Sequence, residues 1–295
     1  GALLADDMGL GKTYQALAFL SWIKEMMADG LYPNRPMLIV APVGLLKNWE
    51  EEHSIHLMSS GLGEVVRLYG KHLQDIKRGS HKAGTASLDT KKLNNADWIL
   101  ANYETVSDYQ LALGAVHFSA VIFDEAQKIK SPQARMTHAA KALHSDFNLV
   151  VTGTPVENRM ADFWCLADTA QPYCLRDLKS FSKKYESDDS QDAVKTLKDQ
   201  VWQGIELNEE QPKLMLRRLK SDNLKGLPRK DEVFMQRKMP IAQAEPYAKV
   251  IEIHRSGSDV QRTAGNKVTM LEIIQHLRQV SLHPALYSKD SGSIR

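Results

Sequence analysis

The stretch that decides the fold is ADDMGLGKT, residues 5–13. A short apolar run precedes it, and a segment with apolar residues at helical spacing follows it. Gly9 and Gly11 let the backbone bend so that successive N–H groups point at phosphate oxygens, and the positive N-terminal end of the next helix adds to the attraction. The pattern Gly-x-x-x-x-Gly-Lys-Ser/Thr of phosphate-binding loops is met except at Asp6, which stands where the first glycine belongs. On this motif alone we favour phosphate binding over an ordinary turn at a helix start.

Two residues at the end of this loop have chemistry that suits a nucleotide. Lys12 is spaced to reach the β- and γ-phosphates, and the hydroxyl of Thr13 is spaced to bind Mg²⁺. The expected bound groups are therefore ATP and Mg²⁺.

A second motif is VIFDEAQ, residues 121–127, where two carboxylates follow a buried apolar run. Ligands of α/β sheets bind beyond the carboxyl ends of the strands, which is where Asp124 and Glu125 are expected. Asp124 there can hold Mg²⁺, and Glu125 can orient and deprotonate the attacking water. The alternative is an ordinary acidic helix start, and we disfavour it because a phosphate loop precedes the motif.

A third motif is VVTGTP, residues 150–155, again at the end of a predicted strand. The small hydroxyl residues Thr152 and Thr154 are suited to sense the γ-phosphate and to relay its loss. Alone, the tripeptide Thr152-Gly153-Thr154 would be a turn and nothing more. The order of the three motifs, each at a strand end, carries the inference.

Short apolar runs alternate with amphipathic stretches through the first half of the chain. The list of predicted strands is 2–5, 37–41, 65–69, 98–102, 120–123 and 149–152, and predicted helices lie at 13–27 and 45–53. Continuous Val/Ile/Leu runs indicate strands buried on both faces, which is typical of a parallel sheet covered by helices. The predicted fold class is α/β, of the doubly wound kind.

The pattern changes after about residue 170. Residues 172–211 are polar and are expected to be mostly helical and exposed. Residues 213–238 carry nine basic residues against three acidic ones, which is compatible with DNA contact or with a solvated face, while Arg217 and Arg218 are also candidates for interdomain packing. A last helix is predicted around 271–280.

Composition excludes some classes of protein. With 43% hydrophobic and 25% charged residues among 295, the chain reads as an ordinary soluble protein, and a net charge of +2 means that any attraction to nucleic acid must come from local basic surface. Cys165 and Cys174 lack metal-ligand spacing and are interpreted as reduced thiols, and the ten histidines form no cluster typical of a metal site. No apolar run approaches the roughly 20 residues needed to span a bilayer, so no membrane partner is expected.

With these motifs the sequence resembles the Swi/Snf-type family of DNA translocases, within the helicase superfamily 2 that includes DEAD-box and DEAH-box proteins. The matching segments are DDMGLGKT, LIVAP followed by Leu45, Trp49 and Glu52, NYET at 102–105, DEAQKIKSP, VVTGTPVEN followed by Phe163 and Trp164, LMLRRLKSD, and LRQ with HPAL near the C-terminus. The resemblance covers nearly the whole chain. The Thr-Gly-Thr-Pro motif favours duplex-DNA translocases, since DEAD-box RNA helicases carry a different third motif.

The resemblance implies a fold and a role for each motif. The fold would be a RecA-like P-loop NTPase lobe with a C-terminal helical extension. Lys12, Asp124 and Glu125 would be catalytic, and Thr13 and Asp124 would bind the metal. Nucleotide contacts would come from Met8, Gly9, Leu10, Gly11, Lys12, Thr13, Tyr14 and Gln127. Coupling of hydrolysis to movement would involve Gln127 with Thr152, Gly153 and Thr154.

DNA contacts are implied for Pro42, Lys47, Asn102, Tyr103 and Thr105. Lys47 is an even choice between DNA contact and a solvated lysine. For Trp49, packing in the core is favoured over stacking on a base.

Family members have two RecA-like lobes with ATP between them, and the second lobe supplies arginines to the site. The expected organisation is an N-terminally truncated lobe 1 at 1–170, a helical protrusion and return helix at 171–225, and a linker with helices leading to an absent lobe 2 at 226–295. The sequence shows no candidate for that second lobe or for the adenine-gripping segment. The chain alone is therefore expected to turn over ATP poorly.

The favoured function is an ATP-dependent translocase on double-stranded DNA that remodels protein–DNA complexes, with protein partners unspecified. Two alternatives stay open: a strand-separating or RNA-directed helicase, and a binding module that docks DNA or protein without hydrolysis. The expected location is cytoplasmic, on the nucleoid in a bacterium, or nuclear in a eukaryote.

Overall fold

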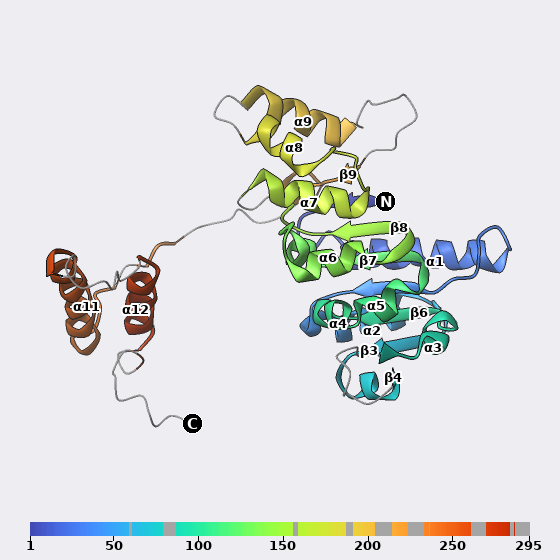
Figure 1. Cartoon of the computed structure of the whole chain (residues 1–295), viewed down its shortest axis with the longest axis horizontal. Helices are drawn as coiled ribbons and strands as arrows, with labels where there is room; N and C mark the ends of the chain where they lie inside the picture. The colour runs from blue at the N-terminus through green and yellow to red at the C-terminus, as the bar shows by residue number, and fades with distance from the viewer. Residues whose placement is uncertain are drawn as a thin grey trace. The chain divides into compact units, whose positions relative to one another are not determined.

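Seven parallel strands form a single sheet in the computed structural model (Figure 1). The strands are β1 (Ala2–Leu4), β2 (Met37–Val40), β3 (Val65–Leu68), β6 (Trp98–Ala101), β7 (His117–Phe123), β8 (His144–Val151) and β9 (Met215–Leu216). Their order across the sheet is β3-β6-β2-β7-β8-β1-β9. A separate antiparallel pair joins β4 (Lys77–Arg78) to β5 (Ser87–Leu88). The α/β class predicted from the sequence is confirmed.

The structure describes residues 1–58, 61–78, 87–155, 159–186, 191–203, 214–223, 233–235, 237–260, 270–283 and 286. The chain divides into two compact units, Gly1–Leu227 and Pro228–Arg295, and each is described by itself. Val156, Glu157 and Asn158 of the third motif lie outside the described residues, as do residues 213, 224–232 and 236 of the basic stretch.

Helices cover both faces of the sheet. One face carries α1 (Lys12–Ala28) and α2 (Val43–His56). The helices whose buried residues belong to the opposite core are α3 (Thr90–Asn94), α4 (Tyr103–Asp108), α5 (Gln110–Gly114), α6 (Arg135–Lys141), α7 (Met160–Ala170), α8 (Leu178–Tyr185) and α9 (Gln191–Gln203). The described part of this unit also contains the 3₁₀ turns Gly70–Asp75 and Ala126–Ile129 and the short α10 (Lys220–Asn223).

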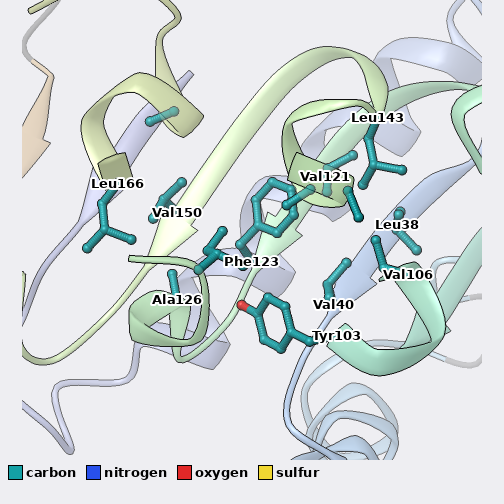
Figure 2. Close-up of a cluster of buried hydrophobic side chains, with 14 of the residues drawn as sticks. Leu38, Val40, Tyr103, Val106, Val121, Phe123, Ala126, Leu143, Val150 and Leu166 are labelled. Carbon is teal, nitrogen blue, oxygen red and sulfur yellow. The ribbon is translucent and has the colours of Figure 1, made fainter. Parts of the chain in front are cut away.

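Alternation along the strands divides the apolar residues between two cores. In β2, Leu38 and Val40 belong to the core under α4 and α6, whereas Met37 and Ile39 belong to the core under α1 and α2. Successive side chains of a strand point to opposite faces, so a strand covered on both sides needs an unbroken apolar run. Figure 2 shows part of the core that contains Leu38 and Val40, with Phe123 of β7 among its side chains.

The predicted elements match the observed ones closely in this unit. The predicted helix at 13–27 is α1, and its predicted inner face is buried: Ala16, Leu20, Ile23 and Met27. The predicted strands all exist, although β7 and β8 begin three and five residues earlier than predicted. β9 was not predicted, because two strand residues inside a basic stretch leave little periodic signal.

One expectation about exposure needs correction. The polar segment 172–211 does form helices where it is described, but Phe181 and Tyr185 of α8 and Leu197 and Val201 of α9 are buried. These side chains join the same core as α7. Their i, i+4 spacing, in a segment that is otherwise polar, is the pattern of an amphipathic helix with one buried stripe.

The second unit contains α11 (Ile241–Val260) and α12 (Met270–Leu282), which pack on each other. Gln243 Nε2 donates hydrogen bonds to the carbonyl oxygens of Val280 at 3.1 Å and Ser281 at 2.5 Å, and Val250 and Val280 are fully buried. The predicted last helix at 271–280 is α12.

Within the described part of the chain, no helix combines the length and the apolar character needed to cross a membrane.

Both cysteines are free thiols, in line with the interpretation made from the sequence. Burial raises the pKa of Cys165 and of Cys174 to about 11. Because the thiolate is the reactive form, we expect both thiols to react slowly at neutral pH. We expect a disulfide reagent to label the folded chain at least 100 times more slowly than the chain in denaturant, as followed by absorbance of the released thiol.

Cys165→Ala provides the control for this prediction. Cys165 is fully buried while Cys174 is half-buried, so the labelling that occurs in the folded state should come from Cys174 and persist in the variant. Rapid labelling of both thiols without denaturant would contradict the burial described here.

Candidate nucleotide site

Three neighbouring strands bring the three sequence motifs to one edge of the sheet. β7, β8 and β1 are adjacent and parallel, so the residues that follow them lie side by side at the carboxyl edge. The loop 5–11 follows β1, Asp124 follows β7 and Thr152 follows β8. Thr152 N–H donates to the carbonyl of Leu4 at 3.0 Å, which ties the third motif to the start of the loop.

The loop itself has the backbone of a phosphate cradle. Gly9 and Gly11 have φ of 85° and 73°, in the left-handed region that side chains disfavour. Gly11 is the N-cap of the 17-residue helix α1 and offers no side-chain cap to its first N–H groups. These donors and the positive end of the helix therefore face the space beyond the loop.

Lys12 lies folded over its own loop. Its Nζ donates to the carbonyl oxygens of Asp6 at 2.9 Å and Asp7 at 3.3 Å. A Cβ placed on Gly153 would lie 3.8 Å from this Nζ, so the first and third motifs face each other across Lys12. A phosphate oxygen offers this ammonium a stronger partner than two neutral carbonyls do.

The other predicted loop residues line the same turn with different exposure. Met8 and Tyr14 are 74% and 52% exposed, and the Tyr14 ring meets the ring of His56 edge-on at 4.9 Å. Leu10 and Thr13 are half-buried.

Asp6 explains why the loop departs from the usual pattern. The residue is fully buried, and its carboxylate accepts hydrogen bonds from the backbone N–H of Arg218 (2.9 Å) and from its guanidinium (2.5–3.2 Å). Gln15 Nε2 donates to the same carboxylate at 3.3 Å. Although burial raises its pKa, the hydrogen bonds from Arg218 and Gln15 outweigh it and hold the pKa of Asp6 below its ordinary value. The sequence suggested interdomain packing for Arg218, but the contacts observed, with Asp6 and Gln15, lie within the first unit.

β9 delivers this arginine to the loop. The N–H groups of Leu3, Ala5 and Asp7 donate in turn to the carbonyls of Leu214, Leu216 and Arg218. The ladder between β1 and β9 therefore continues past the strands and along the first half of the phosphate loop.

Asp124 is held at several points. The residue is 7% exposed, its Oδ2 accepts from Trp49 Nε1 at 2.9 Å, and its Oδ1 accepts from the N–H of Glu125 at 2.9 Å. Tyr103 donates its hydroxyl to the backbone carbonyl of Asp124 at 2.7 Å. Burial raises the pKa of Asp124 and the charge of Glu125 adds to this, while the Trp49 hydrogen bond and the cation of Lys12 act in the opposite direction.

A chain of hydrogen bonds joins the second motif to the third. Gln127 Nε2 donates to Glu125 Oε2 at 2.6 Å, and Gln127 Oε1 accepts from the hydroxyl of Thr152 at 3.1 Å. The same hydroxyl oxygen accepts from the N–H of Thr154 at 3.2 Å. Glu125 has φ of 49°, a strained backbone for a residue with a side chain, at the turn that aims its carboxylate.

These residues fit ATP and Mg²⁺. The Thr13 hydroxyl and the Asp124 carboxylate are oxygen ligands of the kind that Mg²⁺ prefers, and such sites complete their shell with water and phosphate oxygens. The described residues contain no group of three His, Cys, Asp or Glu side chains that would hold a metal by themselves.

The five residues expected at DNA differ in exposure. Lys47 is exposed and pairs with Glu51 at 3.4 Å, while Pro42 and Asn102 are half-buried. Asn102 Oδ1 accepts from the N–H of Thr105 and caps α4. Tyr103 and Thr105 are 2% and 7% exposed. Their side chains face the core, so in this conformation neither offers a surface to DNA.

Sequence reasoning missed the partners of the buried carboxylates. It treated Trp49 as a core residue, which its 1% exposure confirms, but not as a donor to Asp124. It did not pair Asp6 with Arg218. The odd residue of the loop motif was the available signal, because a charge in place of a glycine needs a partner.

The fold and the site together define a RecA-like lobe of a P-loop NTPase. A family model described as the SNF2-related domain matches residues 1–286, and the chain therefore belongs to that family. It corresponds to the N-terminal lobe of a Swi/Snf-type superfamily 2 ATPase, in agreement with the resemblance noted from the sequence.

Similar proteins come from bacteria, archaea and eukaryotes. Zorya protein ZorD of Escherichia coli O139:H28 is 36% identical over 98% of this chain, and the ISWI chromatin-remodeling complex ATPase ISW1 of Saccharomyces cerevisiae is 28% identical over 97%. The chain spans 27% and 24% of the length of these two relatives. The structure titled Sulfolobus solfataricus SWI2/SNF2 ATPase core in complex with dsDNA matches with a TM-score of 0.57 and 27% identity, over 97% of this chain and 55% of that one.

Restoring the usual glycine to the loop should lower the stability of this protein. Asp6→Gly removes the carboxylate that pairs with Arg218 and Gln15, so we expect the free energy of unfolding to fall by about 1–3 kcal/mol. Urea denaturation followed by circular dichroism measures the change. An unchanged or higher stability would mean that the Asp6–Arg218 pair contributes nothing.

Asp6→Asn and Asp108→Asn form a matched pair for the same prediction. Asp108 also pairs with an arginine, Arg135, but both side chains are more than half exposed, so its loss should cost well under about 1 kcal/mol. The deficit of Asp6→Asn should be constant above about pH 4 and should shrink at lower pH, because the depressed pKa of Asp6 gives stability that is lost as the carboxylate protonates.

Proposed function

We propose that this lobe binds Mg·ATP and hydrolyses it as part of a motor that moves along double-stranded DNA and remodels protein–DNA complexes. The observation that carries the proposal is the hydrogen-bonded chain from Glu125 through Gln127 to Thr152. It links the carboxylate suited to activating water with the motif suited to sensing the γ-phosphate. The protein belongs to a family whose members include named chromatin-remodelling ATPases.

In this mechanism each side chain has one task. Lys12 would exchange the loop carbonyls for the β- and γ-phosphates, and Thr13 and Asp124 would hold the metal. Mg²⁺, when bound, neutralises charge that develops on the transferring phosphoryl group. Glu125 orients the attacking water and accepts its proton, which its position beside Asp124 and Gln127 allows.

Loss of the γ-phosphate would then change the positions of the Gln127 and Thr152 side chains. The backbone N–H of Thr152 donates to the carbonyl of Leu4, at the start of the phosphate loop, and its hydroxyl bonds Gln127 and the N–H of Thr154. A shift of Thr152 would therefore move the phosphate loop and the rest of the third motif together. We propose this as the step that couples hydrolysis to movement of the lobe.

Double-stranded DNA is proposed as the track for two reasons. The similar Sulfolobus ATPase core is described in complex with dsDNA, and the Thr-Gly-Thr-Pro motif at 152–155 matches the duplex translocases. The proposed contacts are Lys47 on α2, Pro42 at the N-cap of α2 and Asn102 at the N-cap of α4, since their side chains are not buried.

The test is ATP hydrolysis by the longest natural chain that contains these residues, measured with duplex DNA, single-stranded DNA or RNA. We expect strong stimulation by duplex DNA. Glu125→Gln should abolish turnover while nucleotide binding is retained, because it removes only the proton acceptor. Stimulation by RNA or single strands alone would refute the proposed track, and binding without any hydrolysis would make the lobe a docking module.

We also expect residues 1–295 alone to hydrolyse ATP slowly, since the family resemblance implies arginines supplied by a second lobe. Comparing residues 1–295 with the same residues joined to a second RecA-like lobe measures the effect. Turnover by residues 1–295 at the full rate, lost in Lys12→Ala, would refute this part of the proposal.

Thr152→Val tests the coupling chain directly. The variant keeps the shape of the side chain but cannot bond Gln127 or the N–H of Thr154, so we expect kcat with duplex DNA to fall about 2- to 10-fold with little change in nucleotide affinity. Steady-state hydrolysis and nucleotide titration give the two numbers.

Thr169→Val is the matched control for this variant. Thr169 is also buried, and its hydroxyl donates to the carbonyl of Cys165 within α7. If both variants lose the same fraction of kcat, the loss at Thr152 reflects general packing and the coupling role is excluded.

A further inference from the structure

Two aromatic side chains from two different helices meet at Asp124. Trp49 of α2 donates its indole N–H to the carboxylate at 2.9 Å. Tyr103 of α4 donates its hydroxyl to the backbone carbonyl of the same residue at 2.7 Å. One bond fixes the side chain of Asp124 and the other fixes its backbone.

The residues that make these two hydrogen bonds are buried. Trp49, Tyr103 and Asp124 are 1%, 2% and 7% exposed. Figure 2 shows Tyr103 with its ring among Val40 and Phe123 and with its oxygen toward the segment that follows β7. In such a site a lost hydrogen bond is not replaced by solvent, so the orientation of the carboxylate depends on these donors.

Helix α2 has one face at Asp124 and another at the surface. Leu46 and Trp49 are buried, whereas Lys47 is exposed, with 85% of its side chain accessible. Residues two apart on a helix point in nearly opposite directions. A contact at the outer face of α2 therefore lies on the same helix as Trp49 and two residues away from it.

Helix α4 repeats the arrangement. Asn102 caps it at the surface-facing start, and the next residue, Tyr103, points inward to Asp124. Both helices follow neighbouring strands, since β2 leads to α2 and β6 leads to α4. Close packing leaves little room for either aromatic ring to move without moving Asp124.

We propose that Trp49 and Tyr103 are positioning residues that set Asp124 for the metal and transmit DNA contact at α2 and α4 to the metal site. The DNA part rests on the proposed function, because it assumes that the outer parts of α2 and α4 touch the track. The metal part stands on the geometry at Asp124. Neither aromatic residue touches the reacting atoms, so both act through the carboxylate.

A purely structural role is the competing explanation, since buried aromatic residues also stabilise a core. Matched controls separate the two. Trp164 of α7 is also buried and donates its N–H at 2.9 Å, but to the carbonyl of Arg176. Tyr32 donates its hydroxyl to Asp146 at 3.0 Å, near the start of β8 and thus at the opposite edge of the sheet.

The experiment measures the affinity of the longest natural chain for a fluorescent, non-hydrolysable ATP analogue in four conditions: with Mg²⁺ or with a chelator, and with or without duplex DNA. Trp49→Phe should lose roughly 10- to 100-fold of the affinity gained on adding Mg²⁺, with unchanged affinity in chelator. Tyr103→Phe should lose about 2- to 10-fold, because its bond is to a neutral carbonyl. Trp164→Phe and Tyr32→Phe should match the unchanged protein.

The DNA arm tests transmission. In the unchanged protein duplex DNA should shift Mg·nucleotide affinity, and in Trp49→Phe and Tyr103→Phe this shift should move toward none. A full Mg²⁺ gain in Trp49→Phe, or an equal loss with chelator present, would overturn the positioning role. If DNA alters neither affinity nor hydrolysis in the unchanged protein, the proposed function and the transmission fail together, while loss of the Mg²⁺ gain would still support the positioning of Asp124.

Discussion

Everything in this lobe depends on the requirement that a parallel sheet be covered on both faces. Alternate residues of β2, β6 and β7 supply two separate cores, and the helices that cover them must run back across the sheet after each strand. The carboxyl ends of all the strands therefore collect at one edge, where the polar residues that follow them are kept out of both cores. The closeness of Asp124, Thr152 and the loop at 5–11 is a result of this packing, and needs no direct attraction among the motifs.

The sequence was sufficient for those parts of the structure that have a period or a motif. The apolar runs of β2 and β6 and the stripe along α1 follow from burial alone, and so does the order of the three motifs at the edge. β9 escaped prediction because an edge strand of two residues is specified by its ladder with β1, which is a tertiary interaction. The burial of α8 and α9 escaped because a few apolar residues in a polar segment gain meaning only once a surface exists for them to pack on.

The buried carboxylates show the same limit at the level of single residues. The motif identified Asp124 by its place after a strand, but the indole N–H that holds it comes from a residue 75 positions away. A tryptophan in an apolar face reads as core, and nothing in its own segment shows where its one polar atom points. Asp6 is the reverse case. A charged residue in place of a glycine indicates that a partner is required, but Arg218 is one of several basic residues in its segment and nothing in the sequence marks it as that partner.

The ladder between β1 and β9 also bears on how the chain reaches this state. Asp6 and Arg218 are 212 residues apart, so the phosphate loop is synthesised well before the strand that completes it. At ribosomal rates of 5–20 residues per second the loop waits roughly 10–40 s for its partner strand. During that interval the edge of β1 is open, and an open edge is where a nascent chain pairs with the wrong strand. Any ligand that binds the folded loop and not the unfolded chain would hold the loop in its final turn, and would therefore favour the folded lobe.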